Sequence, residues 1–310
     1  AIHTNAPVPE ADVYQPRGGL LPEVMERNVA TRSSPSRRLL KRALMAMNVK
    51  QRIMLDLERA ALRPGGPMIL AVSQYVARQC EKHYDLNGPR VRVVFNGVDF
   101  TPPGEQERAA QRDAIRKQYQ VAPDCLLLLF VAHNFRLKGL FPLIETASRL
   151  VTAGFRSFKL LVVGRDIPVA YQRKVLARGL GSNVVFAGPT QRTSAFFAAA
   201  DVCVHPTYYD PCSRVVLEAL CSGVPCITTS FNGASEVMTD GQEGFVIDSP
   251  DSVGLWARRI EELGSAALRE KMSSRAAALR EALSMRRHVD ELDKVFTELV
   301  QTRKGRTRTT

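Results

Sequence analysis

The sequence predicts an α/β protein made of two doubly wound lobes, the first of which is incomplete. Between residues 126 and 228, short and continuously apolar segments alternate with helix-like segments of about ten residues. Strands of this kind, separated by helices, are typical of a parallel sheet that is covered on both faces. A length of 310 residues accommodates two such domains. The chain begins with Ala1-Ile2-His3, which resembles the end of an interior strand, so we expect the opening strand and Gly-rich loop of the first lobe to be missing.

In the first lobe we expect a loop over residues 5–19 and then a helical stretch. In this stretch Leu40, Leu44 and Met47 recur at spacings of four and three residues, which is the period of one helix face. The opposite face is the basic one. The sequence Pro64-Gly65-Gly66-Pro67 ends this helix.

The remaining elements follow from the same patterns of apolar residues and helix breakers. Ser73 is the expected N-cap of a helix that runs to about residue 83. Polar residues and two prolines at 101–118 indicate a connection between the lobes that leads into a helix. We expect strands at 68–72, 90–95, 126–131, 159–163, 184–186, 202–204 and 225–228, and helices at 141–153, 168–180, 194–200, 213–221 and within 251–301.

These elements divide the chain into three expected parts. Residues 1–100 form the C-terminal part of the first lobe, and residues 101–284 form the second lobe. Residues 285–310 form a terminal helix that crosses back and a basic tail. Ligands of a doubly wound lobe bind beyond the carboxyl ends of its strands, so the loops at these ends are the expected location of the chemistry.

The net charge of +12 is concentrated in two segments of the chain. Residues 27–52 carry eight basic side chains and no acidic one, and the tail adds Arg303, Lys304, Arg306 and Arg308. Such blocks attract polyanions, either nucleic acid or an anionic membrane surface. A solvated basic face with a disordered tail is the alternative. A nucleic-acid-binding protein is disfavoured for two reasons. No aromatic residues are interleaved with the basic residues of 27–52, and no recognisable nucleic-acid-binding motif is present.

Composition also favours a protein of the cytosol. No run of about 18 apolar residues is present, and the first residues lack the basic start and apolar stretch of a signal peptide. The six cysteines include no Cys-x-x-Cys pair and no His partners at metal-ligand spacing. We therefore expect them to be buried free thiols in a reducing compartment.

The segment from His205 to Pro225 carries the strongest cluster of chemical groups. Asp210 ends a strand-to-helix loop, and Glu218 lies eight positions later, in the second turn of the helix. Between them, the helix N-terminus near Ser213 offers unpaired backbone N–H groups that favour a phosphate. Asp210 can then address the sugar end of a ligand whose diphosphate rests on this helix, and Glu218 can accept hydrogen bonds from ribose hydroxyls. Taken alone, Asp210 is better explained as a helix N-cap, whereas a carboxylate in an apolar helix is costly without a partner.

A second cluster follows the first strand of the second lobe. Arg136 and Lys138 place two cations at the carboxyl end of this strand, where a leaving diphosphate would accumulate charge. Two exposed loop cations without such a role are the alternative. After the next strands, Gly164 permits close approach of the backbone to a ligand, and the loop that contains Pro189 and Thr190 can frame a nucleotide base.

Together these residues resemble glycosyltransferase family 4, whose members carry an acid-x7-acid motif like the one from Asp210 to Glu218. The similarity extends from the first residues to about residue 250. Further matches in order are Val72-Ser73, Asn96-Gly97-Val98-Asp99, Leu137-Lys138-Gly139, Val162-Val163-Gly164, Ala200-Asp201-Val202 and Asp240-Gly241-Gln242-Glu243-Gly244-Phe245. The first acid of the family is normally Glu, and the shorter Asp210 leaves the identity of the donor sugar open. The resemblance implies the GT-B fold, with two Rossmann-like lobes.

The resemblance also implies a reaction and the residues that carry it. Members of the family use a basic pair in place of a divalent ion, so no metal and no other cofactor is expected beside the nucleotide sugar. The departing phosphate oxygen itself would assist the incoming hydroxyl on the same face, which gives retention. The implied catalytic residues are Arg136, Lys138, Asp210, His3 and Asn5, and the implied donor-binding residues are Gly164, Pro189, Thr190, Pro211, Cys212, Ser213, Arg214 and Glu218.

Within the family, the first residues of the chain look like the sequence near the transfer site of lipopolysaccharide core glucosyltransferase I and its relatives. In those enzymes a polar residue at the end of this strand faces the cleft, which makes His3 and Asn5 candidates. A histidine in the core or on the surface is an equal alternative. The same relatives carry a basic helical region that touches the inner membrane, which would explain the charge of residues 27–52.

The expected function is therefore retaining transfer of a hexose, with UDP-glucose as the first choice of donor, to a lipopolysaccharide-core or other lipid-linked glycan. Residues 1–100 would belong to the acceptor-binding lobe, and residues 101–284 would bind the donor. The protein would be cytoplasmic and would bind the inner membrane peripherally through residues 27–52; nucleic acid is not an expected partner. Transfer of mannose or N-acetylglucosamine, and a truncated module that binds a nucleotide sugar without transferring it, are the alternatives.

Overall fold

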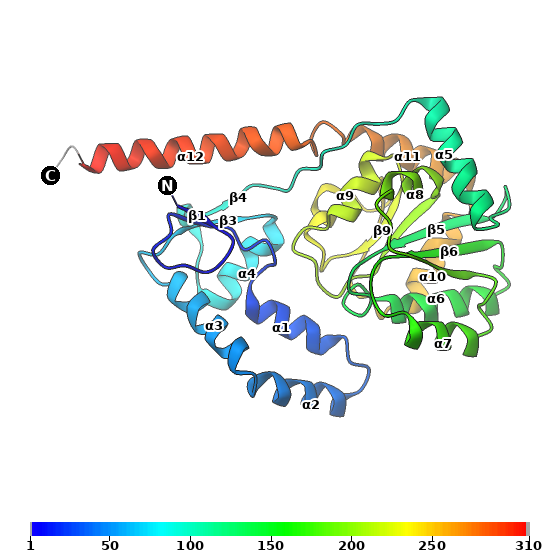
Figure 1. Cartoon of the computed structure of the whole chain (residues 1–310), viewed down its shortest axis with the longest axis horizontal. Coiled ribbons are helices and arrows are strands. Elements are labelled where there is room, and N and C mark those ends of the chain that lie inside the picture. Colours follow the sequence, from blue (N-terminus) through cyan, green and yellow to red (C-terminus); the bar gives the residue numbers. More distant parts are fainter. Residues whose placement is uncertain (1, 308–310) are drawn as a thin grey trace. The chain divides into compact units, whose positions relative to one another are not determined.

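The chain folds into two compact units, each with its own parallel sheet (Figure 1). The computed structural model describes residues 2–307, with side chains up to residue 301. The first unit contains the chain up to Gly97, the segment Tyr209–Cys212 and the chain from Leu283 onward. The second unit contains Val98–Tyr208 and Ser213–Ala282. Among the helices described, none has both the length and the apolar character needed to cross a bilayer.

The sheet of the first unit has its strands in sequence order, all parallel. These are β1 (His3–Thr4), β2 (Val13–Tyr14), β3 (Met68–Ala71) and β4 (Val91–Val93). The expectation of a continuous loop over residues 5–19 was wrong, because β2 lies inside it. A strand of two residues is too short to produce an alternating pattern that the sequence could reveal. In the described sheet β1 lies at one edge.

The two faces of this sheet are covered by different helices. Tyr14 and Ile69 point into a cluster with Leu20, Leu62 and Cys80, on the side of α4 (Gln74–Tyr84). Their neighbours Val13 and Leu70 pack on the other face against α12 (Met285–Thr307), which contributes Leu292, Val295 and Phe296. The side chains of Arg303, Lys304, Arg306 and Arg308, expected in a basic tail, lie outside the described residues.

The basic helical stretch is three helices rather than one. They are α1 (Leu21–Ala30), α2 (Pro35–Ala46) and α3 (Val49–Ala61). The expected single helix is broken at Met47, because the side chain of Asn48 accepts a hydrogen bond from the backbone N–H of Gln51 (3.1 Å) and starts a new helix. The apolar residues that define the expected helix face are largely exposed, with Leu40 at 60%, Leu44 at 57% and Met47 at 77%.

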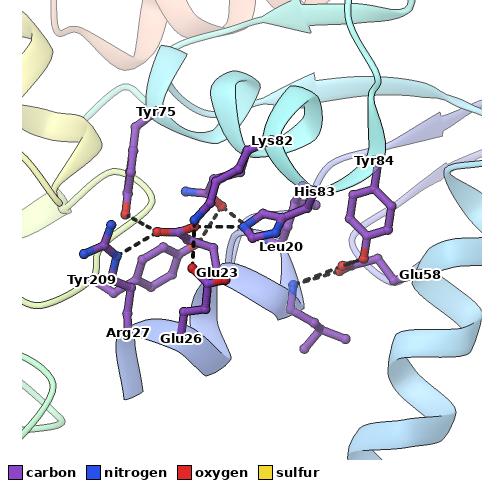
Figure 2. Close-up of polar contacts among 12 residues, drawn as sticks. Leu20, Glu23, Glu26, Arg27, Glu58, Tyr75, Lys82, His83, Tyr84 and Tyr209 are labelled. Carbon is purple, nitrogen blue, oxygen red and sulfur yellow. Dashed lines mark hydrogen bonds and ion pairs between the residues drawn. The ribbon is translucent and has the colours of Figure 1, made fainter. Parts of the chain in front are cut away.

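A buried carboxylate joins α1 to α4 (Figure 2). Glu23 is 2% exposed and accepts hydrogen bonds from Lys82 Nζ (2.7 Å) and Arg27 Nε (2.7 Å). The ring nitrogen Nε2 of His83 lies 2.9 Å from the same carboxylate, and Tyr75 donates its hydroxyl to it at 3.3 Å. Burial alone raises the pKa of Glu23, but the hydrogen bonds from Lys82, His83 and Arg27 outweigh burial and lower the pKa to about 2.

The second unit contains a larger parallel sheet with the strand order β10-β9-β8-β5-β6-β7. Its strands are β5 (Leu126–Val131), β6 (Phe158–Val163), β7 (Val184–Gly188), β8 (Val202–His205), β9 (Cys226–Thr229) and β10 (Gly244–Ile247). The chain builds the sheet outward from β5 in one direction and then returns to pair β8 on the other side of β5. The order therefore reverses between β5 and β8, which is the topological switch point of a doubly wound fold.

Helices cover both faces of this sheet. Figure 1 shows α6 (Leu140–Thr152), α7 (Val169–Ala177) and α10 (Val253–Glu262) on one side, and α8 (Thr193–Ala199), α9 (Arg214–Cys221) and α11 (Ala266–Ala278) on the other. The fully buried Phe130 and Trp256 belong to the core between the sheet and the first group. The remaining helical elements are α5 (Glu105–Gln118) and the short 3-10 turns Gly88–Arg90 and Gly233–Val237.

The fold class expected from the sequence is confirmed. Strand β5 has the expected bounds, and Ser73 accepts a hydrogen bond from Val76 N (3.2 Å), as an N-cap should. Strand β10 was not expected as a strand. The cysteines are free thiols, and all but Cys125 are buried.

The two loops at the switch point are packed against each other. Gly139 has a φ of +81°, and a Cβ atom there would lie 1.9 Å from the carbonyl oxygen of Pro206. The carbonyl oxygen of Leu137 accepts hydrogen bonds from Tyr208 N (2.8 Å) and Thr207 Oγ1 (3.2 Å). The loop after β5 therefore fixes the path of the chain after β8.

Gly139→Ala should therefore destabilise the second unit by more than backbone strain alone. Gly154→Ala is the matched control, because Gly154 also has a positive φ (+92°) but has nothing within 4 Å of an added Cβ atom. In both variants an alanine with a positive φ should lower the free energy of unfolding by about 1 kcal/mol. In Gly139→Ala, the steric overlap with Pro206 should lower it by about 2 kcal/mol more. Urea unfolding of both variants measures the difference. Equal losses would show that the Pro206 contact is not tight.

Glu23→Gln should lower the free energy of unfolding by about 3 kcal/mol near neutral pH, because it breaks a buried ion pair. A carboxyl whose pKa falls from 4.5 to about 2 on folding stabilises the fold above pH 4.5. The difference between Glu23→Gln and the unaltered protein should therefore shrink as the pH falls from 4.5 toward 2. Glu26→Gln, which removes a carboxylate that is 56% exposed, should change little. A difference that does not vary with pH would contradict this.

Candidate functional site

The candidate donor residues of the second unit follow four neighbouring strands. Because β5, β6, β7 and β8 are parallel, the loops after them lie at one edge of the sheet. In strand order these loops and the helix that follows contribute Arg136, Lys138, Gly164, Pro189, Thr190, Ser213, Arg214 and Glu218. The topology thus brings these loops to the same edge of the sheet, and the roles of the residues in them stay predictions.

The loop after β5 is a tight turn with a buried anchor. Phe135 is buried, and its backbone N–H donates to Asp166 Oδ2 (2.7 Å) in the loop after β6. Asn134 Oδ1 accepts from Leu137 N at 3.0 Å, which closes the turn. The guanidinium carbon of Arg136 lies 5.5 Å from the ring centroid of Phe141, so this exposed side chain has a cation–π contact within the unit.

Lys138 differs from Arg136 in its environment. Its side chain is half-buried, and its backbone N–H donates to the carbonyl oxygen of Asn134 (2.9 Å). The next residue is Gly139, whose contact with Pro206 holds the end of the turn. Lys138 therefore lies directly before the glycine that contacts Pro206, next to the switch point.

The two other loops are less informative. Gly164 has a φ of +151°, and a Cβ atom there would lie 1.7 Å from the carbonyl oxygen of Ala132. The packing of two neighbouring strand ends therefore explains this glycine, and its role toward a ligand stays a prediction. After β7, Pro189 is exposed and Thr190 accepts a hydrogen bond from Arg192 N (2.9 Å) through its hydroxyl.

A residue from a later loop holds the start of α9. The backbone N–H of Ser213 donates to Asn232 Oδ1 at 3.1 Å, and Asn232 is completely buried. Asn232 also donates to Thr228 Oγ1 (3.0 Å), which ties it to β9. The first N–H groups of a helix have no acceptor within the helix and carry its positive end. Asn232 therefore holds the N-terminus of α9 in place, with the first backbone N–H groups of the helix as hydrogen-bond donors. The sequence analysis did not identify Asn232, because no local pattern connects it with Ser213.

Glu218 already has a partner within the helix. Its side chain is partly buried, and Arg214 Nη2 lies 3.4 Å from Glu218 Oε1. Burial raises the pKa of Glu218, and the charge of Arg214 opposes this shift. A ligand is therefore not required to explain a carboxylate at this place, although the sequence argument assumed that it was. A pair that is one turn apart and partly exposed is worth only about 0.5 kcal/mol, so a ligand can replace it.

The acid-x7-acid motif is divided between the two units. The segment Tyr209–Cys212, which includes Asp210, belongs to the first unit, whereas Ser213 and Glu218 belong to the second. Ser73 Oγ donates to the carbonyl oxygen of Pro211 at 2.6 Å. The sequence presented the motif as one continuous strand-loop-helix segment and gave no sign of this division.

The candidates nearest the start of the chain also belong to the first unit. His3 and Asn5 are exposed at the end of β1. The His3 ring makes an edge contact with Phe296 of α12, with 5.5 Å between the ring centroids. This contact gives His3 a packing role, and its role in catalysis stays a prediction.

Comparison with known proteins identifies the family. The sequence profile described as Glycosyl transferases group 1 matches residues 111–279. Lipopolysaccharide glucosyltransferase WaaG of Escherichia coli (strain K12) is 28% identical over 196 residues, which cover 63% of this chain and 52% of the relative. A D-inositol 3-phosphate glycosyltransferase of Geodermatophilus obscurus is 31% identical over 235 residues, which cover 71% of this chain and 50% of the relative.

Solved structures share the fold. WaaG, described as a glycosyltransferase involved in lipopolysaccharide biosynthesis, aligns with a TM-score of 0.72 and 25% identity, covering 89% of this chain and 72% of its own. The Anabaena protein HepE, solved in complex with UDP-glucose, aligns with a TM-score of 0.71 over 92% of this chain and 72% of its own. At 18% identity, this second likeness shows the fold alone.

The chain spans about half the length of the curated relatives it matches. The family profile covers more than half of this chain, and it includes the loops after β5 to β8 and the helix α9. The two parallel α/β sheets are those of the GT-B glycosyltransferases. The chain therefore belongs to the glycosyl transferases group 1 family.

Proposed function

We propose that this chain takes part in retaining transfer of a hexose from a nucleoside diphosphate sugar, with UDP-glucose as donor. One observation carries the proposal. Two cations, Arg136 and Lys138, follow β5, and the N-terminus of α9 follows β8, so that both flank the topological switch point of the sheet. Open α/β sheets bind their ligands at this point. A diphosphate is the ligand that such positive groups favour.

The donor would be held by groups with separate tasks. The first N–H groups of α9, together with Arg136 and Lys138, would stabilise the charge that develops on the diphosphate as the sugar leaves. Glu218 would exchange Arg214 for the ribose hydroxyls, and Asp210 would bind the sugar. Gly164, Pro189, Thr190, Pro211 and Cys212 would line the donor site. In this arrangement the two side-chain cations take the place of a divalent ion.

The chemical step would then need no protein nucleophile. The bond between the anomeric carbon and the phosphate oxygen breaks, and the acceptor oxygen bonds to the same carbon on the same face. The acceptor proton passes to the departing phosphate oxygen, so atoms and charge balance. His3 and Asn5 would act on the acceptor side. Preorganised charge on the leaving group is the main contribution of this chain to the rate.

For the acceptor we propose a lipopolysaccharide-core or other lipid-linked glycan. The printed name of the Escherichia coli relative supports this choice. The Geodermatophilus obscurus relative is named for D-inositol 3-phosphate instead, which makes a small phosphorylated polyol the alternative acceptor. Both choices leave the proposed donor chemistry unchanged.

A surface of the first unit fits an anionic membrane, and we propose that it binds one. Helices α2 and α3 and the turn between them expose Leu39, Leu40, Leu44, Met47, Val49, Ile53 and Leu57. Six of the eight basic side chains of residues 27–52 lie in these two helices, and residues 27–52 contain no acidic one. Apolar side chains beside clustered bases are the features of helices that lie in the membrane interface. Such binding would bring the protein to a lipid-linked acceptor.

Glu218→Gln should weaken binding of UDP-glucose by about 1.5–3 kcal/mol, the worth of a charge-assisted hydrogen bond to the ribose. Isothermal titration with UDP-glucose and other common nucleotide sugars measures the loss and identifies the donor. Glu262→Gln is the matched control, because Glu262 forms a similar intrahelical pair with Arg259 on α10 and is not a candidate site residue. It should leave affinity unchanged. Unchanged affinity in Glu218→Gln would contradict the ribose role.

Lys138→Ala should reduce turnover by about 100-fold while the affinity for the donor falls much less. The reason is that charge on the diphosphate grows as the sugar leaves, so a cation helps the transition state more than the ground state. Release of UDP from UDP-glucose, with and without a glycan acceptor, gives the rate. Equal losses in rate and affinity would indicate simple binding, and donor binding without any release of UDP would favour the non-transferring module.

Leu44→Asp should weaken binding to vesicles that contain anionic lipid at least about fivefold, because it places a charge where an apolar side chain would enter the interface. Leu176→Asp is the control, since Leu176 is 71% exposed on α7 in the other unit. Vesicle sedimentation at two salt concentrations measures both effects. Equal binding of the two variants would argue against this surface.

A further inference from the structure

We propose that Tyr209 and Gln79 are positioning residues that fix Asp210 from the first unit. This inference rests on the proposed function, in which Asp210 binds the donor sugar. The chain leaves the second unit after Tyr208, packs four residues into the first unit and returns at Ser213. We call the residues that enclose this segment the socket; they are Gly19, Ser73, Tyr75, Gln79 and Asn96.

Tyr209 is the deepest part of the segment. It is 2% exposed, and its hydroxyl donates to Gln79 Oε1 at 3.0 Å. Its ring lies beside that of Tyr75, with 5.8 Å between the centroids. On another side, a Cβ atom on Gly19 would lie 1.5 Å from the Tyr209 hydroxyl, so only glycine fits there. Burial raises the pKa of Tyr209, which keeps the phenol protonated and able to donate.

Gln79 is held so that its oxygen faces Tyr209. It is 2% exposed, and Oε1 also accepts from the backbone N–H of Leu20 (3.3 Å). Two donors directed at one atom identify that atom as the amide oxygen. Within the described part of the chain, Gln79 Nε2 has no hydrogen-bond partner. A buried amide group with two unused N–H donors is costly for stability. We infer that Gln79 is kept because its oxygen accepts the hydrogen bond from Tyr209.

The socket residue Tyr75 is held in turn by Glu23 and the cations that pair with Glu23. Figure 2 shows Tyr75 and Tyr209 beside this carboxylate. Tyr75 donates its hydroxyl to Glu23 (3.3 Å), which Lys82 and Arg27 hold in turn. The nitrogen of Lys82 also lies 2.7 Å from Glu26, so a cation already occupies the space between the two carboxylates. We therefore infer that these charged residues hold Tyr75 in place and do not bind a metal ion.

The segment is also held on the other side of Asp210. Ser73 Oγ donates to the carbonyl oxygen of Pro211 (2.6 Å), and Asn96 Nδ2 donates to that of Cys212 (3.3 Å). Asp210 itself is only partly buried. The chain is thus held before and after Asp210.

This arrangement separates two tasks. Asp210 belongs to the first unit, whereas Glu218 and the N-terminus of α9 belong to the second. Loss of the Tyr209 hydroxyl should therefore disturb the sugar and leave the nucleotide in place. Sub-ångström to ångström shifts of a reacting group lower turnover strongly, and they affect binding of the remote part of a substrate little.

The test is Tyr209→Phe, which removes the hydroxyl and keeps the ring. Hydrogen exchange of the peptide that spans residues 207–213 should become at least about tenfold faster, and kcat should fall about tenfold. The dissociation constant for UDP should stay within about twofold. Tyr84→Phe is the matched control, because it removes another phenol hydrogen bond, the partly buried one to Glu58, in the same unit. It should leave all three quantities unchanged. Asn96→Ala should act in the same direction as Tyr209→Phe and is the second variant.

The outcomes separate this inference from the function on which it rests. Unchanged exchange at 207–213 in Tyr209→Phe and Asn96→Ala would overturn the socket. Faster exchange with unchanged kcat would overturn the positioning role, even if Glu218→Gln confirms the donor site. If the unaltered protein neither binds UDP nor transfers sugar, the proposed function fails. Faster exchange in the two variants would then still support the attachment of Tyr209–Cys212 to the first unit.

Discussion

The reversal of strand order between β5 and β8 is the constraint on which the proposed donor site depends. Strand β5 is almost completely buried and pairs with β6 on one side and β8 on the other. The chains that leave β5 and β8 must diverge to opposite faces of the sheet, so their loops border the crevice between them. Gly139 and Pro206 bring these loops into contact. A cationic turn and the positive end of a helix are thereby held at one edge.

The parts of the fold that the sequence predicted best are those where one physical signal dominates. Strand β5 is buried on both faces, so its run Leu126–Val131 is apolar throughout and its bounds were predicted correctly. Ser73 caps α4 through a local hydrogen bond, which residue type and position reveal without knowledge of the fold. The candidate donor residues were proposed largely because they follow such strands. Their individual roles remain predictions.

What the sequence could not predict depends on contacts between distant residues. Strand β2 has two residues and forms only because β1 and β3 flank it. Asn232 lies 19 positions after the Ser213 that it holds, so no local pattern connects them. The helical stretch was misjudged because its apolar face predicts burial, whereas this face is exposed. Gly164 serves contact with Ala132, which a single sequence does not distinguish from contact with a ligand.

Because Tyr209–Cys212 pack into the first unit, the second unit cannot be separated from it without exposing these residues. A fragment cut at Gly97 would retain these four residues within the donor unit but would lose Ser73, Gln79 and Asn96, which cover them. An aromatic ring and a thiol that are now buried would face water beside the proposed sugar site. The second unit is therefore not a self-sufficient module. A stretch of four residues makes the integrity of the loop after β8 depend on a separate part of the polypeptide.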